Sequence, residues 1–246
     1  MMSSAFRVRA VLLLQSMLAS VFLLTGLQDV QAEVIISGVE PHIQENILAY
    51  LRLDNENCEA PHWRVRRLFI DADREIRDAL EVLGFYNAEI EKRLKLGDTC
   101  WQAKIEIDPG QPVLLRTVSI EIDTGGAHDD VELARVAGEC ALLVGDVLQH
   151  ASYEACRVSI ARTAETRGYF DARFSERRID VFPQEHAADI RLHIVTGPRF
   201  VFGEFTFDQA VLDEELIERF VRIEPGEPYD AMRVRRFQRY LITSAY

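Results

Sequence analysis

The hexapeptide LGFYNA (Leu83–Ala88) returns later in the chain as RGYFDA (Arg167–Ala172). Each copy follows a stretch with apolar residues at helical spacing and precedes a stretch in which apolar and polar residues alternate. Because glycine often ends a helix in a left-handed turn, we expect Gly84 and Gly168 to occupy such turns. A repeat at the length of a small domain indicates that the chain is built from tandem modules.

The segments around the two copies predict helices that pack on a sheet. Before each copy, apolar residues recur at three- and four-residue spacing, which is typical of a helix with one buried face. After each copy they alternate with polar residues, which is typical of a strand with one buried face. The helical faces are Leu68, Ala72, Ile76, Ala79, Leu80 and Leu83, then Tyr153, Cys156, Ile160 and Ala164; the strand faces are Ala103, Ile105 and Ile107, then Ile190, Leu192 and Ile194.

Turns rich in proline and glycine follow both alternating stretches and mark the module boundaries. They are DPGQP (Asp108–Pro112) and TGPR (Thr196–Arg199). A new strand and a helix that starts with acidic residues follow each turn. The repeated unit is therefore β-α-α-β-β, and the fold class is α+β, with two helices packed on a three-stranded mixed sheet in each module.

This unit divides the chain into three modules. We expect module 1 at residues 33–108, module 2 at 109–196 and module 3 at 197–246, the last without its closing hairpin. In module 3 a strand should start around Phe205 and Phe207, and the second helix should reach Leu241.

The first residues are typical of a secretory signal peptide. Arg7 and Arg9 precede an apolar run from Ala10 to Leu27, and Ala32 supplies the small residue before a cleavage site. We therefore expect residues 1–32 to be a signal peptide and the mature chain to begin near Glu33.

An exported chain meets an oxidising environment, in which cysteines pair. The four cysteines, Cys58, Cys100, Cys140 and Cys156, allow three connectivities. We favour Cys58 with Cys100 and Cys140 with Cys156, since each bridge then stays within one module. The alternative is four free thiols in small cores.

Charge and motifs argue against nucleic-acid binding and catalysis. With 28 basic against 40 acidic residues, the chain has a formal charge of −12, which repels phosphate backbones and anionic lipid. The motifs of serine hydrolases, zinc proteases, phosphate loops and redox dithiols are missing. Cys58 and His62 make only half a metal site, and the acidic residues at Asp129-Asp130 and Asp213–Glu215 suit helix starts. We expect no catalytic, cofactor or metal site.

The repeated unit, in which Gly84-Phe85-Tyr86 or Gly168-Tyr169-Phe170 closes the second helix, resembles the POTRA domain of the Omp85 superfamily. Within that superfamily it is most similar to the TamA family, whose members carry three POTRA domains followed by a β-barrel. The stretches that carry this likeness are Ala72–Leu80, Pro109–Val113 and Arg167–Asp171.

This resemblance implies a role in protein export. The modules would face the periplasm, and a barrel missing from this chain would sit in the outer membrane. The implied partners are a TamB-like protein anchored in the inner membrane and unfolded outer-membrane protein clients, including autotransporters. The alternatives are the POTRA region of another Omp85 or two-partner secretion transporter, and a soluble periplasmic binding adaptor.

An outer strand of such a sheet could take up an extended client by strand addition. We expect this edge on the strand from Tyr169 to Val181, where Phe170, Ala172 and Phe174 should point inward. Charged residues along the same strand fit a merely protected edge equally well. We expect Phe85, Tyr86, Tyr169 and Phe170 to pack between helix and sheet. The residues of the client edge are Tyr169, Asp171, Arg173, Ser175 and Arg177.

Overall fold

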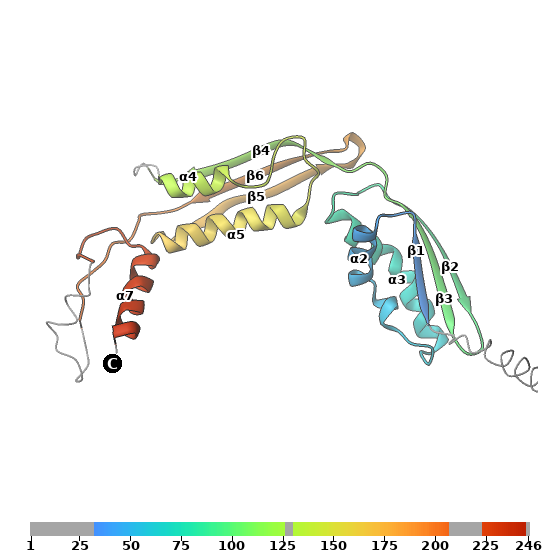
Figure 1. Cartoon of the computed structure of the whole chain (residues 1–246). Coiled ribbons are helices and arrows are strands. Elements are labelled where there is room, and N and C mark those ends of the chain that lie inside the picture. The colour runs from blue at the N-terminus through green and yellow to red at the C-terminus, as the bar shows by residue number, and fades with distance from the viewer. Residues whose placement is uncertain (1–31, 126–129, 207–222, 245–246) are drawn as a thin grey trace, which may run out of the picture.

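The computed structural model describes residues 32–125, 130–206 and 223–244 of the chain (Figure 1). The expected signal peptide lies outside the described residues except for Ala32, as do Asp129, Phe207 and the acidic run Asp213–Glu215. Within the described part, no helix is both long and apolar enough to span a bilayer.

The first domain is a three-stranded sheet with two helices on one face (Figure 1). Its strands lie in the order β1-β3-β2, with β1 parallel and β2 antiparallel to the central β3. In chain order its elements are β1 (Glu33–Ser37), α2 (Pro41–Tyr50), the 3-10 turn η1 (Arg52–Asn55), α3 (His62–Glu81), β2 (Glu89–Leu96) and β3 (Trp101–Asp108).

Its core lies between α3 and the central strand, as the periodicity predicted. The α3 residues Leu68, Ala72, Ile76, Ala79 and Leu80 are all buried, while Leu83 is partly buried against the same cluster. The alternating face of β3, with Ala103, Ile105 and Ile107, is almost fully buried.

The second domain repeats this arrangement. Its strands lie in the order β4-β6-β5, again with one parallel and one antiparallel pair around the central strand. The predicted faces Tyr153, Cys156, Ile160, Ala164 and Ile190, Leu192, Ile194 are buried in one cluster. The α+β fold is thereby confirmed. The elements are β4 (Leu114–Asp123), α4 (Val131–Gly138), α5 (His150–Thr166), β5 (Arg173–Phe182), the 3-10 turn η2 (Pro183–Glu185) and β6 (Ala187–Val195).

The third segment differs from its prediction. Its helix α7 (Ala231–Ser244) forms where the second helix of module 3 is expected. The expected strand does not form at Phe205, and Phe207 lies outside the described residues. Just before them, Val201 makes an isolated β-bridge with Pro228.

Both favoured disulfides are present. Cys58 is bonded to Cys100 in the first domain, and Cys140 to Cys156 in the second. Cys58 is thus unavailable to the half metal site with His62, and the described residues contain no group of three or more potential ligands that could hold a metal ion.

Candidate functional site

The predicted client edge lies on β5, which is an outer strand of the second sheet. Arg173, Ser175 and Arg177 are exposed along this strand, and Asp171 is exposed just before it. Tyr169 does not belong to the edge: β5 starts only at Arg173, and Tyr169 is 4% exposed. The Tyr169 ring is buried in the core, and its backbone does not join the strand.

The β5 edge also carries features that hinder pairing with another strand. Its register with β6 shifts between Phe174 and Glu176, and such irregularities bend an edge away from a partner. Arg178 and Asp180 form an exposed ion pair along it. Charged side chains of this kind protect sheet edges.

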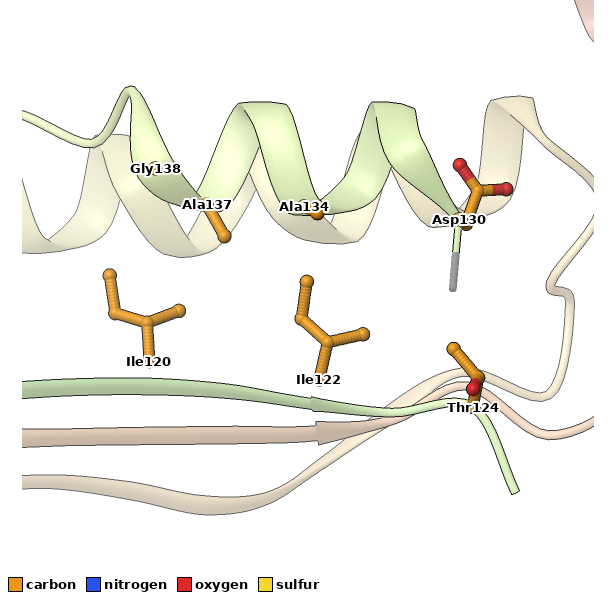
Figure 2. Close-up of a pocket in the computed structure, with 7 residues that line it drawn as sticks. All are labelled: Ile120, Ile122, Thr124, Asp130, Ala134, Ala137 and Gly138. Carbon is orange, nitrogen blue, oxygen red and sulfur yellow. The ribbon is translucent and has the colours of Figure 1, made fainter. Parts of the chain in front are cut away.

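A groove runs along the opposite outer strand, β4, and separates it from α4 (Figure 2). Its volume is about 420 Å³. Ile120 and Ile122 are half-buried and point from the strand toward the helix. The lining residues are Ile120, Ile122, Thr124, Asp130, Ala134, Ala137 and Gly138.

The strand beside the groove is open over most of its length. The loop before α5 covers its start: the Leu115 N–H donates to the Asp146 carbonyl and the Gly145 N–H to the Leu115 carbonyl, both at 2.8 Å. Beyond Arg116 the outer edge of β4 has no paired strand among the described residues. Its outward N–H and C=O groups are therefore available to an added strand.

Small residues on α4 keep the groove open. The two helices can be aligned on the residues that precede them, Glu40 before α2 and Asp130 before α4. The third residue after each is buried, Ile43 in the first domain and Leu133 in the second. The seventh is the fully buried Ile47 in α2 and Ala137 in α4. An isoleucine fills the space against the first sheet, whereas alanine leaves it empty against the second.

Asp130 holds the start of α4. Its Oδ1 accepts hydrogen bonds from the N–H groups of Glu132 at 3.1 Å and Leu133 at 3.3 Å. Its Oδ2 accepts from Arg167 Nε at 2.7 Å and from the Tyr169 hydroxyl at 3.0 Å. Burial alone would raise the pKa of this carboxyl, but the hydrogen bonds from Arg167, Leu133 and Tyr169 outweigh it and lower the pKa below its usual range.

The Cys140–Cys156 disulfide holds the other end of α4. Cys140 follows the helix by two residues, and its partner Cys156 is buried on α5. Hydrogen bonds of Asp130 at one end and a covalent bond at the other thus restrain movement of α4 toward β4. The groove is therefore preformed, which lowers the entropy cost of binding.

The two glycine motifs lie at the joints between successive domains. The Gly84 carbonyl accepts a hydrogen bond from the Val113 N–H at 2.8 Å, and the Gly168 carbonyl accepts one from the Phe200 N–H at 2.9 Å. Both glycines have the predicted positive φ, +92° and +88°. The repeated motif is thus the contact that each domain makes with the segment after it.

At the first joint, the domains touch closely. A Cβ on Gly84 would lie 2.6 Å from the Leu148 carbonyl oxygen. Tyr86 packs against the core of the second domain, and its hydroxyl is 2.9 Å from His150 Nε2. Burial and the negative charge of Glu81 raise the pKa of Tyr86 to about 12.

At the second joint, contacts between aromatic rings take the place of the Tyr86–His150 hydrogen bond. Phe170 meets Phe200 and Tyr229 edge-on, with ring centroids 5.3 and 5.0 Å apart. Arg199 donates to the carbonyls of Arg167 at 2.7 Å and Tyr229 at 3.0 Å.

The expectation that all four motif aromatics pack within their own module is therefore wrong for two of them. Phe85 and Tyr169 lie against the core of their own domain, as expected. Tyr86 and Phe170 contact the next segment instead. Phe170 is 50% exposed and does not point inward, whereas Ala172 and Phe174 do.

The sequence prediction also missed the groove along β4. Its signal was available: Ala134, Ala137 and Gly138 stand at three- and four-residue spacing and place small side chains on one helical face. Such a stripe is ambiguous without the strand opposite, because small residues equally allow a helix to approach more closely.

The first domain matches a known family: the model described as POTRA domain TamA domain 1 matches residues 33–109. Among solved structures, POTRA domains 3–5 of Haemophilus influenzae BamA are similar at 19% identity, covering 91% of this chain and 89% of that chain, with a TM-score of 0.45. POTRA domains 1–3 of Omp85 from Anabaena are similar at 17% identity, covering 86% and 84%, with a TM-score of 0.36. The family match identifies the first domain: residues 33–109 form a POTRA domain.

Proposed function

We propose that this chain is the periplasmic POTRA region of an outer-membrane protein translocation and assembly factor of the TamA type, and that it is not an enzyme. The family match of residues 33–109 supports this reading. A second domain with the same β-α-α-β-β order follows, joined through the same glycine contact. A string of such domains suits the display of successive binding surfaces.

The proposed activity is the binding of unfolded outer-membrane protein segments by strand addition to β4. The observation that carries it is the preformed groove beside an open outer strand. Main-chain hydrogen bonds to β4 would supply affinity for many sequences, while Ile120, Ile122 and Ala137 would receive an apolar side chain from every second residue of the client. Clients with alternating apolar residues, as barrel strands have, fit this pattern.

The β5 edge is the second candidate for the client site. Its exposed residues Asp171, Arg173, Ser175 and Arg177 would contact a client through polar side chains. Its register with β6 shifts between Phe174 and Glu176, as that of β4 does between Leu115 and Thr117. The two edges therefore predict different client preferences, apolar alternation at β4 and polar character at β5.

The remaining parts of the proposal concern partners and location. A TamB-like protein anchored in the inner membrane would be the partner, and a barrel outside this chain would hold the region at the outer membrane. The alternatives are the POTRA region of another Omp85 or two-partner secretion transporter, and a soluble periplasmic adaptor. Reading the parent gene past Tyr246 separates them, because only a transporter continues into about ten-residue alternating strands.

Hydrogen exchange with and without an unfolded barrel-strand peptide tests the client site. We expect new protection over residues 116–123 of β4. Protection confined to residues 173–182 would move the site to β5, and no protection on either strand would overturn the strand-addition mechanism.

A filled groove provides the matched variant. Ala137→Ile places in α4 the side chain that α2 carries at its seventh position, and we expect it to weaken peptide binding about tenfold or more, since a difference of 1.4 kcal/mol is tenfold. Ala155→Ile, at an exposed position of α5, adds the same side chain away from the groove and should leave binding unchanged. Equal binding by both variants and the parent chain would exclude the groove.

A further inference from the structure

The outer face of α3 carries a stripe of cationic and apolar side chains. Residues three and four apart lie on one side of a helix, and this stripe is opposite the buried residues Leu68, Ala72 and Ile76. Trp63 is 68% exposed and Ile70 is 71% exposed. The α3 stripe consists of Trp63, Arg66, Arg67, Ile70 and Arg74, all exposed.

The three arginines of the α3 stripe are not used within the domain. Neighbouring arginines on the same helix are: Arg64 pairs with Glu56 at 2.8 Å, and Arg77 donates to the Ala88 carbonyl at 2.7 Å. Arg66, Arg67 and Arg74 form no ion pair with any residue that the structure describes. A chain with a net charge of −12 thus keeps three unpaired cations together, beside its exposed tryptophan.

The corresponding helix of the second domain has no such stripe. On α5 the exposed positions include Glu154, Val158, Arg162 and Glu165. Carboxylates are therefore interspersed with the cations, and Arg157 is paired with Glu154 at 2.6 Å. The second domain therefore lacks the cationic face that the first domain carries on its shared fold.

We propose that the α3 stripe docks the first domain on an anionic lipid surface. Arginines near such a surface are attracted to its phosphate headgroups. Tryptophan favours the boundary between headgroups and acyl chains, and an apolar residue on the same face adds shallow insertion. From Trp63 to Arg74 the stripe spans about 16 Å of helix. It is a convex ridge, which a flat layer of headgroups can contact along its whole length.

Trp63 provides a direct readout. The chain has two tryptophans, and the other, Trp101, is 3% exposed, so lipid contact should change the fluorescence of Trp63 alone. We expect a blue shift when the chain meets phosphatidylcholine vesicles that contain phosphatidylglycerol, and none with pure phosphatidylcholine. Trp63→Phe should abolish the shift and still co-sediment with the anionic vesicles. A chain that neither shifts nor co-sediments would overturn the proposal.

A pair of triple variants distinguishes lipid binding through the α3 stripe from lipid binding that depends only on net charge. Removing Arg66, Arg67 and Arg74 by Gln substitutions should weaken binding to anionic vesicles about a hundredfold, at roughly fivefold per arginine near the surface. The control replaces Arg93, Lys95 and Lys104, exposed on β2 and β3, by Gln. It loses the same charge and should bind like the parent chain.

Two outcomes would contradict the assignment. Equal weakening by both triple variants would mean that only the net charge matters. Binding to polyglutamate that depends on the α3 stripe, without binding to anionic vesicles, would assign the stripe to an acidic protein partner instead. Neither outcome bears on the β4 groove, so the proposed client binding is tested independently.

Discussion

The two domains share one fold but differ in how the first helix meets the first strand. In the first domain Ile47 is fully buried in the core cluster, which also contains Ile36 of β1. In the second, Ala137 stands in the same helical position and a groove of about 420 Å³ remains beside β4. One shared backbone thus supports a closed surface and an open one, because the difference lies in side-chain volume and not in topology.

The restraints on the helices differ as well. The second domain bonds both ends of α4 to other elements, through Asp130 and through Cys140. In the first domain Glu40, at the same position before α2, makes no side-chain cap.

Removing the disulfides should cause the largest loss of stability in both domains. Cys58→Ala with Cys100→Ala opens a bridge of sequence separation 42, and Cys140→Ala with Cys156→Ala one of separation 16. The chain-entropy model gives losses of about 4 and about 3 kcal/mol. Urea unfolding measures both. Only the second pair should also weaken peptide binding, because it releases α4; equal effects of the two pairs on binding would contradict the anchoring role.

Exchanging the side chains at the seventh helical position should have the next largest effect. Ile47→Ala removes a buried side chain and should cost the first domain about 3 kcal/mol, since the cavity cannot refill completely. Ala137→Ile fills an existing space and should change the stability of the second domain by less than about 1 kcal/mol. Urea unfolding compares the two variants. A large loss in both would mean that the groove is too narrow to take the side chain.

Asp130→Asn should cost about 2 kcal/mol at neutral pH. Asparagine still caps a helix, so the loss reports the charged hydrogen bonds to Arg167 and Tyr169. The folded pKa of Asp130 lies below its unfolded value of about 3.9, so this stability is present above that pH and is lost as the pH falls through the folded pKa. Unfolding measured against pH should show the difference between the parent chain and the variant closing below about pH 4. A constant difference down to pH 2 would refute the assignment.

The smallest effect concerns the joint between the domains. Gly84 and Gly145 both have a positive φ, +92° and +94°, but only Gly84 meets another group, the Leu148 carbonyl. Both Ala variants lose the ease of glycine in a left-handed turn. Gly84→Ala should cost about 1 kcal/mol more, because its Cβ must also displace the second domain. Thermal unfolding of the two variants measures this difference. Equal losses of stability would show that the second domain moves aside without cost.

The fold was predictable from residues that follow local rules. Periodicity placed the buried faces of α3, α5, β3 and β6, and the recurrence of Gly84 as Gly168 set the length of the module. The disulfide pairing followed once each bridge was kept within a module.

The functional surfaces were less predictable, because they depend on pairs of distant elements. The groove arises from Ala137 on α4 and Ile122 on β4 together, and neither residue is unusual by itself. Tyr86 was expected in its own module and lies against the next, since a sequence motif does not reveal which of two neighbouring cores an aromatic ring enters. Tyr169 was expected on an edge strand, but its hydroxyl meets a buried carboxylate from another helix.

The bond between the His150 N–H and the Val82 carbonyl, 3.0 Å long, has a consequence for the order of folding. Every helix ends with carbonyls and begins with N–H groups that it cannot satisfy alone. Here a carbonyl at the end of α3 accepts a hydrogen bond from an N–H at the start of α5. The first domain therefore receives part of its helix cap from the second. If the chain enters the periplasm from its N-terminus, the first domain completes its hydrogen bonding only after about forty further residues have followed its last strand.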